Sequence, residues 1–198
     1  MKLIVATNNK DKLVEFKRIL EPIGFEVLSQ KDAGIKVNPD ETGSSFAENA
    51  KIKAMAAFEA SGFACVADDS GICVDALDGR PGIYSARYMG EDTPQEIKNA
   101  SLLDELKDVP MENRGAQYVC AICCILQDGS IFETEGICRG EIGYEPIGDG
   151  GFGYDPIFMA NGKSYSQITG EEKDLMSHRG KALRELHKIL SEKLNSKK

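Results

Sequence analysis

The chain has 198 residues, of which 41% are hydrophobic, and its 24 Lys and Arg against 32 Asp and Glu give a formal charge of -8. A chain of this length buries about 70% of the surface that it exposes when unfolded, so we expect one soluble globular domain over residues 1–198. The acidic balance excludes a protein that binds nucleic acid through a basic face, but it is compatible with a local cationic pocket for a small phosphorylated ligand.

The N-terminal apolar run, residues 3–6, is too short for the core of a signal peptide, and polar residues follow it at once. Nowhere does the sequence approach the roughly 20 apolar residues that a membrane-spanning helix requires. We therefore expect a cytoplasmic protein that makes no contact with membranes.

Three of the six cysteines, Cys120, Cys123 and Cys124, form a Cys-x-x-Cys-Cys pattern inside an apolar run. A zinc site would need a second pair of ligands, and a redox dithiol usually opens a helix. Because this pattern lies in a predicted strand, we expect the cysteines to be small core residues with free thiols.

The first half of the chain alternates predicted strands with predicted helices. Residues 3–6 and 25–28 form apolar strands, and the segment between them has apolar residues at helical spacing: Leu13, Phe16, Ile19 and Leu20. A second helix follows the polar residues 41–45 and ends at Gly62; its apolar residues are Phe46, Ala50, Ala54 and Phe58. Residues 63–67 and 72–77 predict two strands that meet at an acidic turn, residues 68–71.

In the second half, a loop rich in Gly, Pro and Tyr precedes a helix that begins after Thr93, the expected N-cap, with Glu96 at the capping-box position, and ends near Lys107. Residues 116–126 and 130–139 flank an Asp-Gly turn and predict a long hairpin. After a glycine loop at residues 148–154, a last helix is expected over residues 177–194, and residues 195–198 are expected to be disordered. These elements predict an α/β fold, a mixed and elongated sheet flanked by helices.

The turn between the first strand and the first helix, Ala-Thr-Asn-Asn-Lys-Asp-Lys from Ala6, offers free backbone N–H groups and two lysines, Lys10 and Lys12. Such a turn suits phosphate groups, although an ordinary polar turn with solvated lysines has the same composition. It is not a Walker A loop, because the required glycine and Gly-Lys-Ser/Thr spacing is missing.

Two adjacent carboxylates, Asp68 and Asp69, follow an apolar run, and a second acidic pair, Asp40 and Glu41, lies earlier in the chain. One of the former can orient or deprotonate a water, and Mg²⁺ usually takes one or two protein carboxylates together with phosphate oxygens and waters. The alternatives are a simple turn for residues 68–71 and a helix lead-in for Asp40 and Glu41.

The glycine loop contains a literal G-x-G-x-x-G from Gly148, but Asp155-Pro156 blocks the helix that a dinucleotide site requires. We interpret it instead as a loop that brings Phe152 and Tyr154 to a planar ligand. Further cationic groups lie at Lys173 and in the segment Ser-His-Arg-Gly-Lys from Ser177. The alternative is that these residues are the solvated start of a helix.

Together these stretches closely resemble the inosine triphosphate pyrophosphatase family, also called the Ham1 family. The resemblance rests on four motifs: ATNNKDK from Ala6, ADDSGICVDALDGRPGIYSARY from Ala67, GGFGYDPIF from Gly150 and EEKDLMSHRGKAL from Glu171. It departs from the family pattern at Asn8, where glycine is common. The resemblance implies a Maf/Ham1-like fold with two lobes and a cleft between them.

It further implies a Mg²⁺-dependent homodimer that hydrolyses deaminated purine nucleoside triphosphates, such as ITP, dITP and XTP, to the monophosphate and pyrophosphate. Asp69 would be the general base, and the metal would be held by Asp69 with Asp40 or Glu41. The substrate would be bound by Thr7, Asn8, Asn9, Lys10, Asp11, Lys12, Ser70, Phe152, Gly153, Tyr154, Asp155, Lys173, His178 and Arg179.

The chemistry of the substrate agrees with these roles. Lys10, Lys12 and Mg²⁺ would neutralise the charge that develops on pyrophosphate. Hypoxanthine and xanthine present an O6 acceptor where adenine has a donor, so His178 and Arg179 would favour the deaminated bases. A pyrophosphatase of broader specificity and a nucleotide-binding regulator without turnover are the alternatives.

Overall fold

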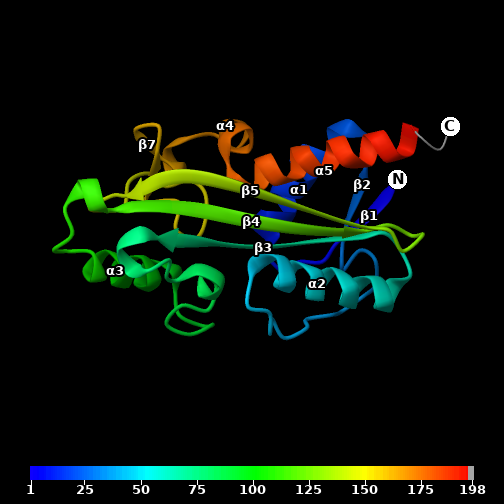
Figure 1. Ribbon diagram of the computed structural model, residues 1–198, viewed down its shortest axis with the longest axis horizontal. Coiled ribbons are helices and arrows are strands. Elements are labelled where there is room, and N and C mark those ends of the chain that lie inside the picture. The colour runs from blue at the N-terminus through cyan, green and yellow to red at the C-terminus, as the bar shows by residue number, and fades with distance from the viewer. Residues whose placement is uncertain (196–198) are drawn as a thin grey trace. The chain divides into compact units, whose positions relative to one another are not determined.

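The structure, a computed structural model, describes residues 1–195, and the chain forms two compact units (Figure 1). Unit 1 contains residues 1–69, 120–136 and those from 178 onward, and unit 2 contains residues 70–119 and 137–177. The predicted tail lies almost wholly outside the described residues. No helix within residues 1–195 is long and apolar enough to cross a membrane.

Seven strands form one mixed sheet in the order β2-β1-β3-β4-β5-β6-β7. The strands are β1 (Lys2–Val5), β2 (Glu26–Ser29), β3 (Cys65–Val74), β4 (Gly115–Ile125), β5 (Ile131–Ile142), β6 (Phe158–Ala160) and β7 (Lys163–Ser164). The first strand pairs in parallel with β2 and β3, whereas β6 pairs antiparallel with β5 and β7. The α helices are α1 (Lys10–Leu20), α2 (Phe46–Ser61), α3 (Gln95–Glu105), α4 (Gly170–Met176) and α5 (His178–Asn195). The prediction of an α/β fold with a mixed, helix-flanked sheet is confirmed.

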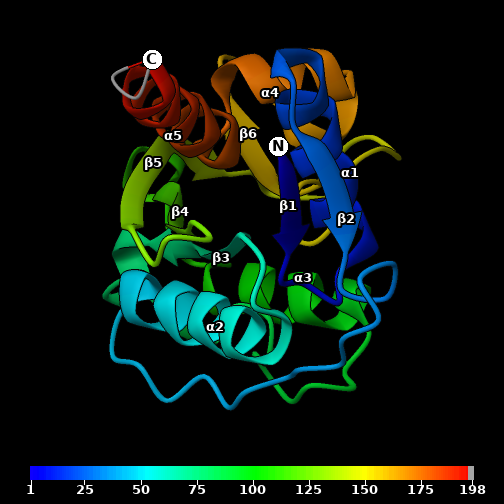
Figure 2. The same ribbon diagram turned by 90° about the vertical axis from the view of Figure 1, so that its right-hand side faces the viewer.

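In unit 1, the strand residues alternate between two apolar clusters, as the two-residue period of a strand requires. Leu3 and Val5 of β1 pack in one cluster with α1 and α5, whereas Ile4 packs in the other with α2. Figure 2 shows α2 on one side of the unit 1 strands and α1 with α5 on the other. Both faces of these strands are therefore buried, which explains their continuous apolar sequence.

The cysteine pattern follows the same alternation. Cys120 and Cys124 belong to the cluster of α1 and α5, and Cys123 belongs to the cluster of α2. All three are buried with free thiols, and burial raises the pKa of the Cys123 thiol to about 11. The prediction of core cysteines is confirmed for this motif, because thiols that stay protonated are poor nucleophiles and poor metal ligands.

Unit 2 has its own core, in which aromatic rings from strands and loops meet. Tyr118 of β4 makes an edge contact with Phe158 of β6, with 4.7 Å between ring centroids, and stacks on Tyr165 at 5.8 Å. Leu102 and Leu106, of α3 and its C-cap, pack in the same cluster.

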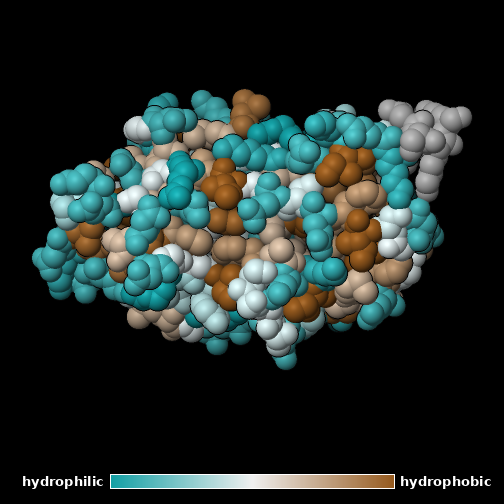
Figure 3. Space-filling model, in the orientation of Figure 1, coloured by the Kyte–Doolittle hydropathy of each residue, from teal (hydrophilic) through white to brown (hydrophobic). Residues whose placement is uncertain are grey.

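On the face drawn in Figure 3, hydrophobic residues are interspersed among hydrophilic ones.

Three local predictions need correction. Residues 65–74 form one strand rather than two strands with an acidic turn, because each carboxylate has a cationic partner beside the strand: Arg179 for Asp68 and Lys53 for Asp69. Helix α3 has Pro94 rather than Thr93 at its N-cap, since the Thr93 hydroxyl donates to the Met89 carbonyl instead. The short helix α4 was not predicted, although Thr169 and Glu172 form a capping box at its start.

Candidate active site

The continuous strand β3 determines how the two adjacent carboxylates are used. Neighbouring side chains of a strand point to opposite faces of the sheet, so Asp68 and Asp69 belong to different surroundings. Asp68 bonds to residues of α1 and α5, and Asp69 bonds to residues of α2. We call the charged residues joined in this way the acidic network: Glu15, Glu41, Asp68, Asp69, Lys12, Lys53 and Arg179.

Asp68 is a buried carboxylate with two cationic partners. Its Oδ2 atom lies 3.0 Å from Nζ of Lys12 and accepts hydrogen bonds from Nε and Nη2 of Arg179, at 3.2 and 2.9 Å. Burial alone would raise the pKa of Asp68, but the charges of Lys12 and Arg179 outweigh it and hold this pKa far below its ordinary value. Asp68 is therefore ionised at every physiological pH.

Arg179, at the second position of α5, is almost completely buried between Asp68 and Glu15. Its Nη1 donates to Glu15, a buried acid of α1, while Nε and Nη2 are directed at Asp68. Burial lowers the pKa of Arg179, but the two carboxylates raise it well above its ordinary value. This geometry directs all three guanidinium nitrogens at the two buried acids.

Asp69 meets a different set of partners on α2. Its Oδ1 lies 2.9 Å from Nζ of Lys53, and its Oδ2 accepts a hydrogen bond from the Asn49 amide at 3.2 Å. The same Lys53 ammonium donates to Glu41 at 2.7 Å. Burial raises the pKa of Asp69 and Glu41 acts in the same direction, whereas Lys53 opposes them, so that the net shift is upward. A carboxylate whose pKa is raised is a better proton acceptor than an ordinary one.

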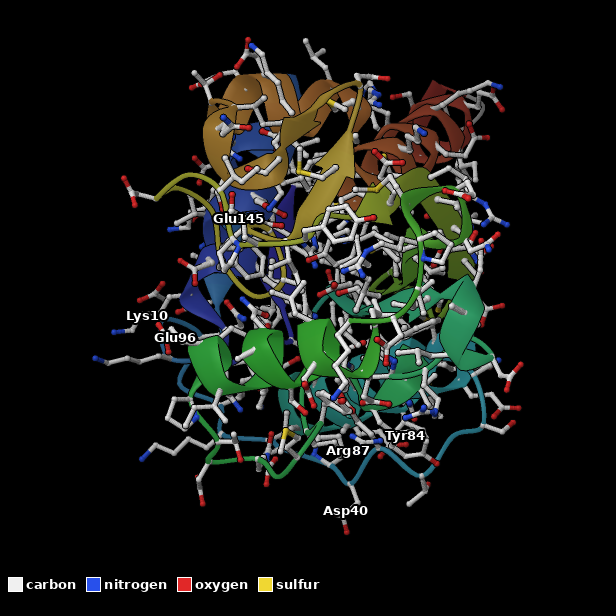
Figure 4. The ribbon with its side chains drawn as sticks, turned by 90° about the vertical axis from the view of Figure 1, so that its left-hand side faces the viewer. Lys10, Asp40, Tyr84, Arg87, Glu96 and Glu145 are labelled. Atoms are coloured by element: carbon white, nitrogen blue, oxygen red, sulfur yellow. The ribbon has the colours of Figure 1, made fainter. Side chains whose placement is uncertain are left out.

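The loop before α2 carries the predicted metal ligands, and Asn49 holds it in place. The Asn49 side chain accepts from the Gly43 amide at 2.8 Å, and a Cβ atom on Gly43 would lie only 2.7 Å from that acceptor. Glu41 is half-buried and joined to Asp69 through Lys53, whereas Asp40 is exposed and points away from its loop (Figure 4). Of the two alternatives that the sequence left open, the geometry favours Glu41.

The donor set of the acidic network suits a divalent cation that also binds phosphate. Within residues 1–195, no group of three or more His, Cys, Asp or Glu side chains is arranged to hold a metal ion. Mg²⁺ needs only one or two protein carboxylates when phosphate oxygens and waters complete its shell. Asp69 and Glu41 already converge on one cationic group, the Lys53 ammonium. On the other face of β3, Asp68 and Glu15 form a separate set of ion pairs with Lys12 and Arg179.

The predicted phosphate turn is built as a helix N-cap. The Asn9 side chain caps α1 by accepting from the amides of Asp11 and Lys12, at 2.8 and 3.1 Å, and the Thr7 hydroxyl accepts from the Asn9 amide. Asn8 donates to Asn38 at 3.0 Å, so the residue at the family's glycine position bridges to the loop that leads to Asp40. Lys10 is exposed and points outward (Figure 4).

In unit 2, the glycine loop is organised by a buried ion pair that we call the loop ion pair, Asp155 and Lys173. Nζ of Lys173 lies 2.6 Å from Oδ2 of Asp155 and 4.4 Å from the ring centroid of Phe152. The same Asp155 oxygen accepts from the Phe152 amide at 2.8 Å. Gly151, with φ of +72°, must be glycine because a Cβ atom would lie 2.3 Å from Asp155. Phe152, Asp155 and Lys173 thus form one cluster in unit 2.

The remaining predicted residues fall near these two groups. Ser70 continues β3 directly after Asp69. His178 begins α5 and is buried, and Gly136 of β5 approaches its carbonyl so closely that a Cβ atom would lie 2.0 Å from it. The structure therefore brings Lys12 and Arg179 to Asp68 in unit 1, and Phe152 and Lys173 to Asp155 in unit 2. It does not bring Lys10 or Asp40 to these groups, because both are exposed and point outward.

Sequence reasoning missed three members of the site: Glu15, Asn49 and Lys53. Asn49 and Lys53 are four residues apart in α2, a spacing that places both on one helical face among alanines. That polar pair on an otherwise small, apolar face was a signal available in the sequence. Glu15 gave no comparable signal, because a lone acid in an amphipathic helix is usually solvated.

The chain matches the Ham1 family over residues 3–189. It is 46% identical to a dITP/XTP pyrophosphatase of an Exiguobacterium species, over 94% of this chain and 95% of that protein. It is 43% identical to the dITP/XTP pyrophosphatase of Bacillus subtilis, over 94% of this chain and 96% of that protein. Among solved structures, the Ham1 protein of Staphylococcus aureus superposes with a TM-score of 0.86 at 37% identity, covering 98% of this chain and 100% of that one.

The fold and the acidic site define an α/β protein whose charged residues suit a phosphorylated ligand and a divalent cation. With a family match that covers most of its length, the chain belongs to the Ham1 family.

Proposed function

We propose that this protein hydrolyses deaminated purine nucleoside triphosphates, among them ITP, dITP and XTP, to the nucleoside monophosphate and pyrophosphate. The observation that carries the proposal is Asp69, a mostly buried carboxylate with a raised pKa that is held by Asn49 and Lys53. The names of the relatives from Exiguobacterium and Bacillus subtilis support the same substrate class. The protein would remove damaged purines from the nucleotide pool.

In the proposed reaction, Asp69 accepts a proton from a water that attacks the α-phosphorus. The new bond joins the water oxygen to phosphorus, and the bond from phosphorus to the bridging oxygen breaks, so that pyrophosphate leaves with its electron pair. Asn49 and Lys53 keep the carboxylate in one orientation during this step. The turn from Thr7 to Lys12 attracts the phosphates through the positive charge of Lys10 and Lys12.

Mg²⁺ would be held by Asp69 and Glu41, and when bound it would supply positive charge to the triphosphate and the leaving pyrophosphate. Lys53 already supplies positive charge between these two carboxylates. Lys12 is held by its ion pair with Asp68, on the face of β3 opposite to Asp69.

Base recognition is assigned to the glycine loop of unit 2, and His178 of unit 1 is proposed separately as a substrate-binding residue. Phe152 and Tyr154 offer ring faces for stacking, and Lys173 and Asp155 fix the loop that carries them. We expect a hydrogen-bond donor of the protein to meet the O6 acceptor of hypoxanthine. Adenine has a donor at this position, so the protein donor would stay unpaired when adenine is bound, at a cost of about 1 to 3 kcal/mol. Arg179 contributes by fixing Asp68 rather than by direct contact with the base.

The proposal includes a cytoplasmic homodimer, as the family resemblance implies. Residues 83–88, which include two tyrosines, are a candidate contact of the dimer. Tyr84 is exposed and Arg87 lies over its ring, with 5.2 Å from the guanidinium carbon to the ring centroid (Figure 4).

The test is to incubate the protein with ITP and Mg²⁺ and to quantify IMP, pyrophosphate and free phosphate, with ATP and GTP in parallel. We expect equal amounts of IMP and pyrophosphate from ITP and little product from ATP or GTP. An Asp69→Asn variant should lose about 10³-fold in kcat, since the amide cannot accept the proton. Asp75→Asn is the matched control, because Asp75 is an exposed carboxylate paired with Arg139, and it should retain full activity.

Three outcomes would contradict the proposal. Release of IDP and free phosphate would place cleavage at the γ-phosphate, so that the attack on the α-phosphorus would be wrong. Comparable rates with ATP and GTP would favour the alternative of a pyrophosphatase with broader specificity, and binding of ITP without turnover would favour a regulator.

A further inference from the structure

Helix α3 carries two adjacent polar side chains, Lys98 and Asn99, that are both buried, with exposed fractions of 3% and 6%. Lys98 donates through Nζ to the Ala86 carbonyl at 2.5 Å, and Asn99 donates through Nδ2 to the Gly153 carbonyl at 3.1 Å. Both acceptors are backbone groups of loops rather than of strands or helices. A buried lysine and a buried asparagine on one helix therefore serve to hold two loops in place.

The two loops are also joined to each other. The Tyr154 hydroxyl, in the glycine loop, donates to the Ser85 carbonyl at 2.9 Å. The Ser85 hydroxyl accepts from the Ile72 amide of β3 at 2.9 Å and donates to the Gly82 carbonyl at 2.6 Å. A chain of hydrogen bonds within unit 2 thus connects α3, the loop at residues 85–90 and the glycine loop.

At Gly153 itself, packing does little to fix the backbone. Gly153 has φ of +63°, and a Cβ atom there would meet no heavy atom within 4 Å. The backbone at Gly153 is held by hydrogen bonds instead, among them the bond from the Asp155 amide to the Phe152 carbonyl at 3.2 Å, which closes a turn over Gly153. The Phe152 amide is held by Asp155 on one side, and the Gly153 carbonyl is held by Asn99 on the other. These two bonds hold the backbone on both sides of the Phe152–Gly153 peptide, and so position the residue that carries the Phe152 ring.

We propose that Asn99 is a positioning residue that fixes the glycine loop for recognition of the substrate's purine base. The inference rests on the proposed function, in which Phe152 and Tyr154 stack on that base. Gln95 orients the Asn99 amide by donating to its oxygen at 3.0 Å, which leaves the amide nitrogen directed at Gly153. Asn99 acts on the binding of the base and not on the cleavage of the phosphoanhydride.

The first test compares Asn99→Ala with the unsubstituted protein for steady-state hydrolysis of ITP. KM should rise about tenfold while kcat changes less than about threefold, because the lost bond supports ground state and transition state alike. Asn99→Asp keeps the shape but replaces the donor with a carboxylate facing a carbonyl, so its KM should rise further. Ser61→Ala, which removes a side-chain bond to the Ala57 carbonyl in unit 1, is the control and should leave KM unchanged.

A binding experiment separates positioning from a merely structural role. In Asn99→Ala, the Kd of IMP should rise about tenfold, whereas the Kd of pyrophosphate, which has no base, should stay within twofold. A double-mutant cycle with Gly153→Ala should be non-additive in the Kd of IMP, since both changes release the same loop.

The inference is overturned if the variants fold but keep the KM of ITP and the Kd of IMP, or if the binding of pyrophosphate weakens equally. A failure of the unsubstituted protein to form IMP from ITP would instead overturn the proposed function, and this inference with it. The two failures are distinguishable because the second appears before any residue is changed.

Discussion

The acidic network of unit 1 and the loop ion pair of unit 2 use buried charge in different ways. The loop ion pair has one carboxylate and one ammonium, and its partners are a backbone amide and aromatic rings. The acidic network joins more carboxylates than cations, and Lys53 is shared between two of them. In the loop ion pair, the charges of Asp155 and Lys173 cancel, and the pair serves to fix a loop. Where Asp69 and Glu41 share the single charge of Lys53, negative charge is left over, and this suits a cation that binds together with the substrate.

The largest expected effect comes from removing a cation of the network. Arg179→Met would leave Asp68 and Glu15 buried without their shared partner, so the free energy of unfolding should fall by about 4 kcal/mol in urea denaturation. Lys173→Met, which breaks the loop ion pair, should cost about 3 kcal/mol because it strands one carboxylate. The exposed pair provides the control: Arg139→Met should cost less than about 1 kcal/mol. Equal losses in all three variants would remove the distinction between buried and exposed pairs.

The adjacent carboxylates of the network should respond to pH in opposite directions. The pKa of Asp68 is lower in the folded chain than in the unfolded one, so its stabilising contribution is present above pH of about 4 and is lost as the pH falls through the folded value. The pKa of Asp69 is higher in the folded chain, so its contribution is greatest at low pH and is lost as the pH rises through the folded value.

This contrast is measured as the free energy of unfolding from pH 3 to pH 7 without added metal. Relative to the unsubstituted protein, Asp68→Asn should lose stability mainly at the neutral end, and Asp69→Asn should gain a little there. If both substitutions shift the curve in the same direction, the two faces of β3 do not separate the carboxylates as described.

The smallest effect is expected in the turn before α1, where the Asn8 side chain bonds to the side chains of Asn38 and Gln30. Asn8→Gly removes the bond to Asn38 and places the residue common in the family at this position. Because that bond is exposed, thermal unfolding should reveal a change within about 0.5 kcal/mol, and KM for ITP should change less than about twofold. A KM change as large as that expected for Asn99→Ala would show that Asn8 has a direct part in binding.

Much of the fold was predictable because periodicity in the sequence reports burial. Leu183, Leu186 and Leu190 recur at helical spacing, and all three are buried in α5. The hairpin was predicted from an Asp-Gly turn, and β4 and β5 are neighbours in the sheet on either side of it. The acidic segment of β3 was mistaken for a turn, since Asp, Ser and Gly favour turns when no partner is known.

The sequence by itself determined the fold class, the motifs that define the family and the residue types available for chemistry. Only the tertiary structure decided that Asp68 and Asp69 lie on opposite faces of one strand, that Lys53 joins Asp69 to Glu41, and that Arg179 is enclosed by two acids. The reason is physical: local patterns report the environment of a residue relative to its own element. Which distant charge becomes its partner depends on how helices far apart in sequence pack on the sheet, and on the balance between desolvation and ion pairing that follows.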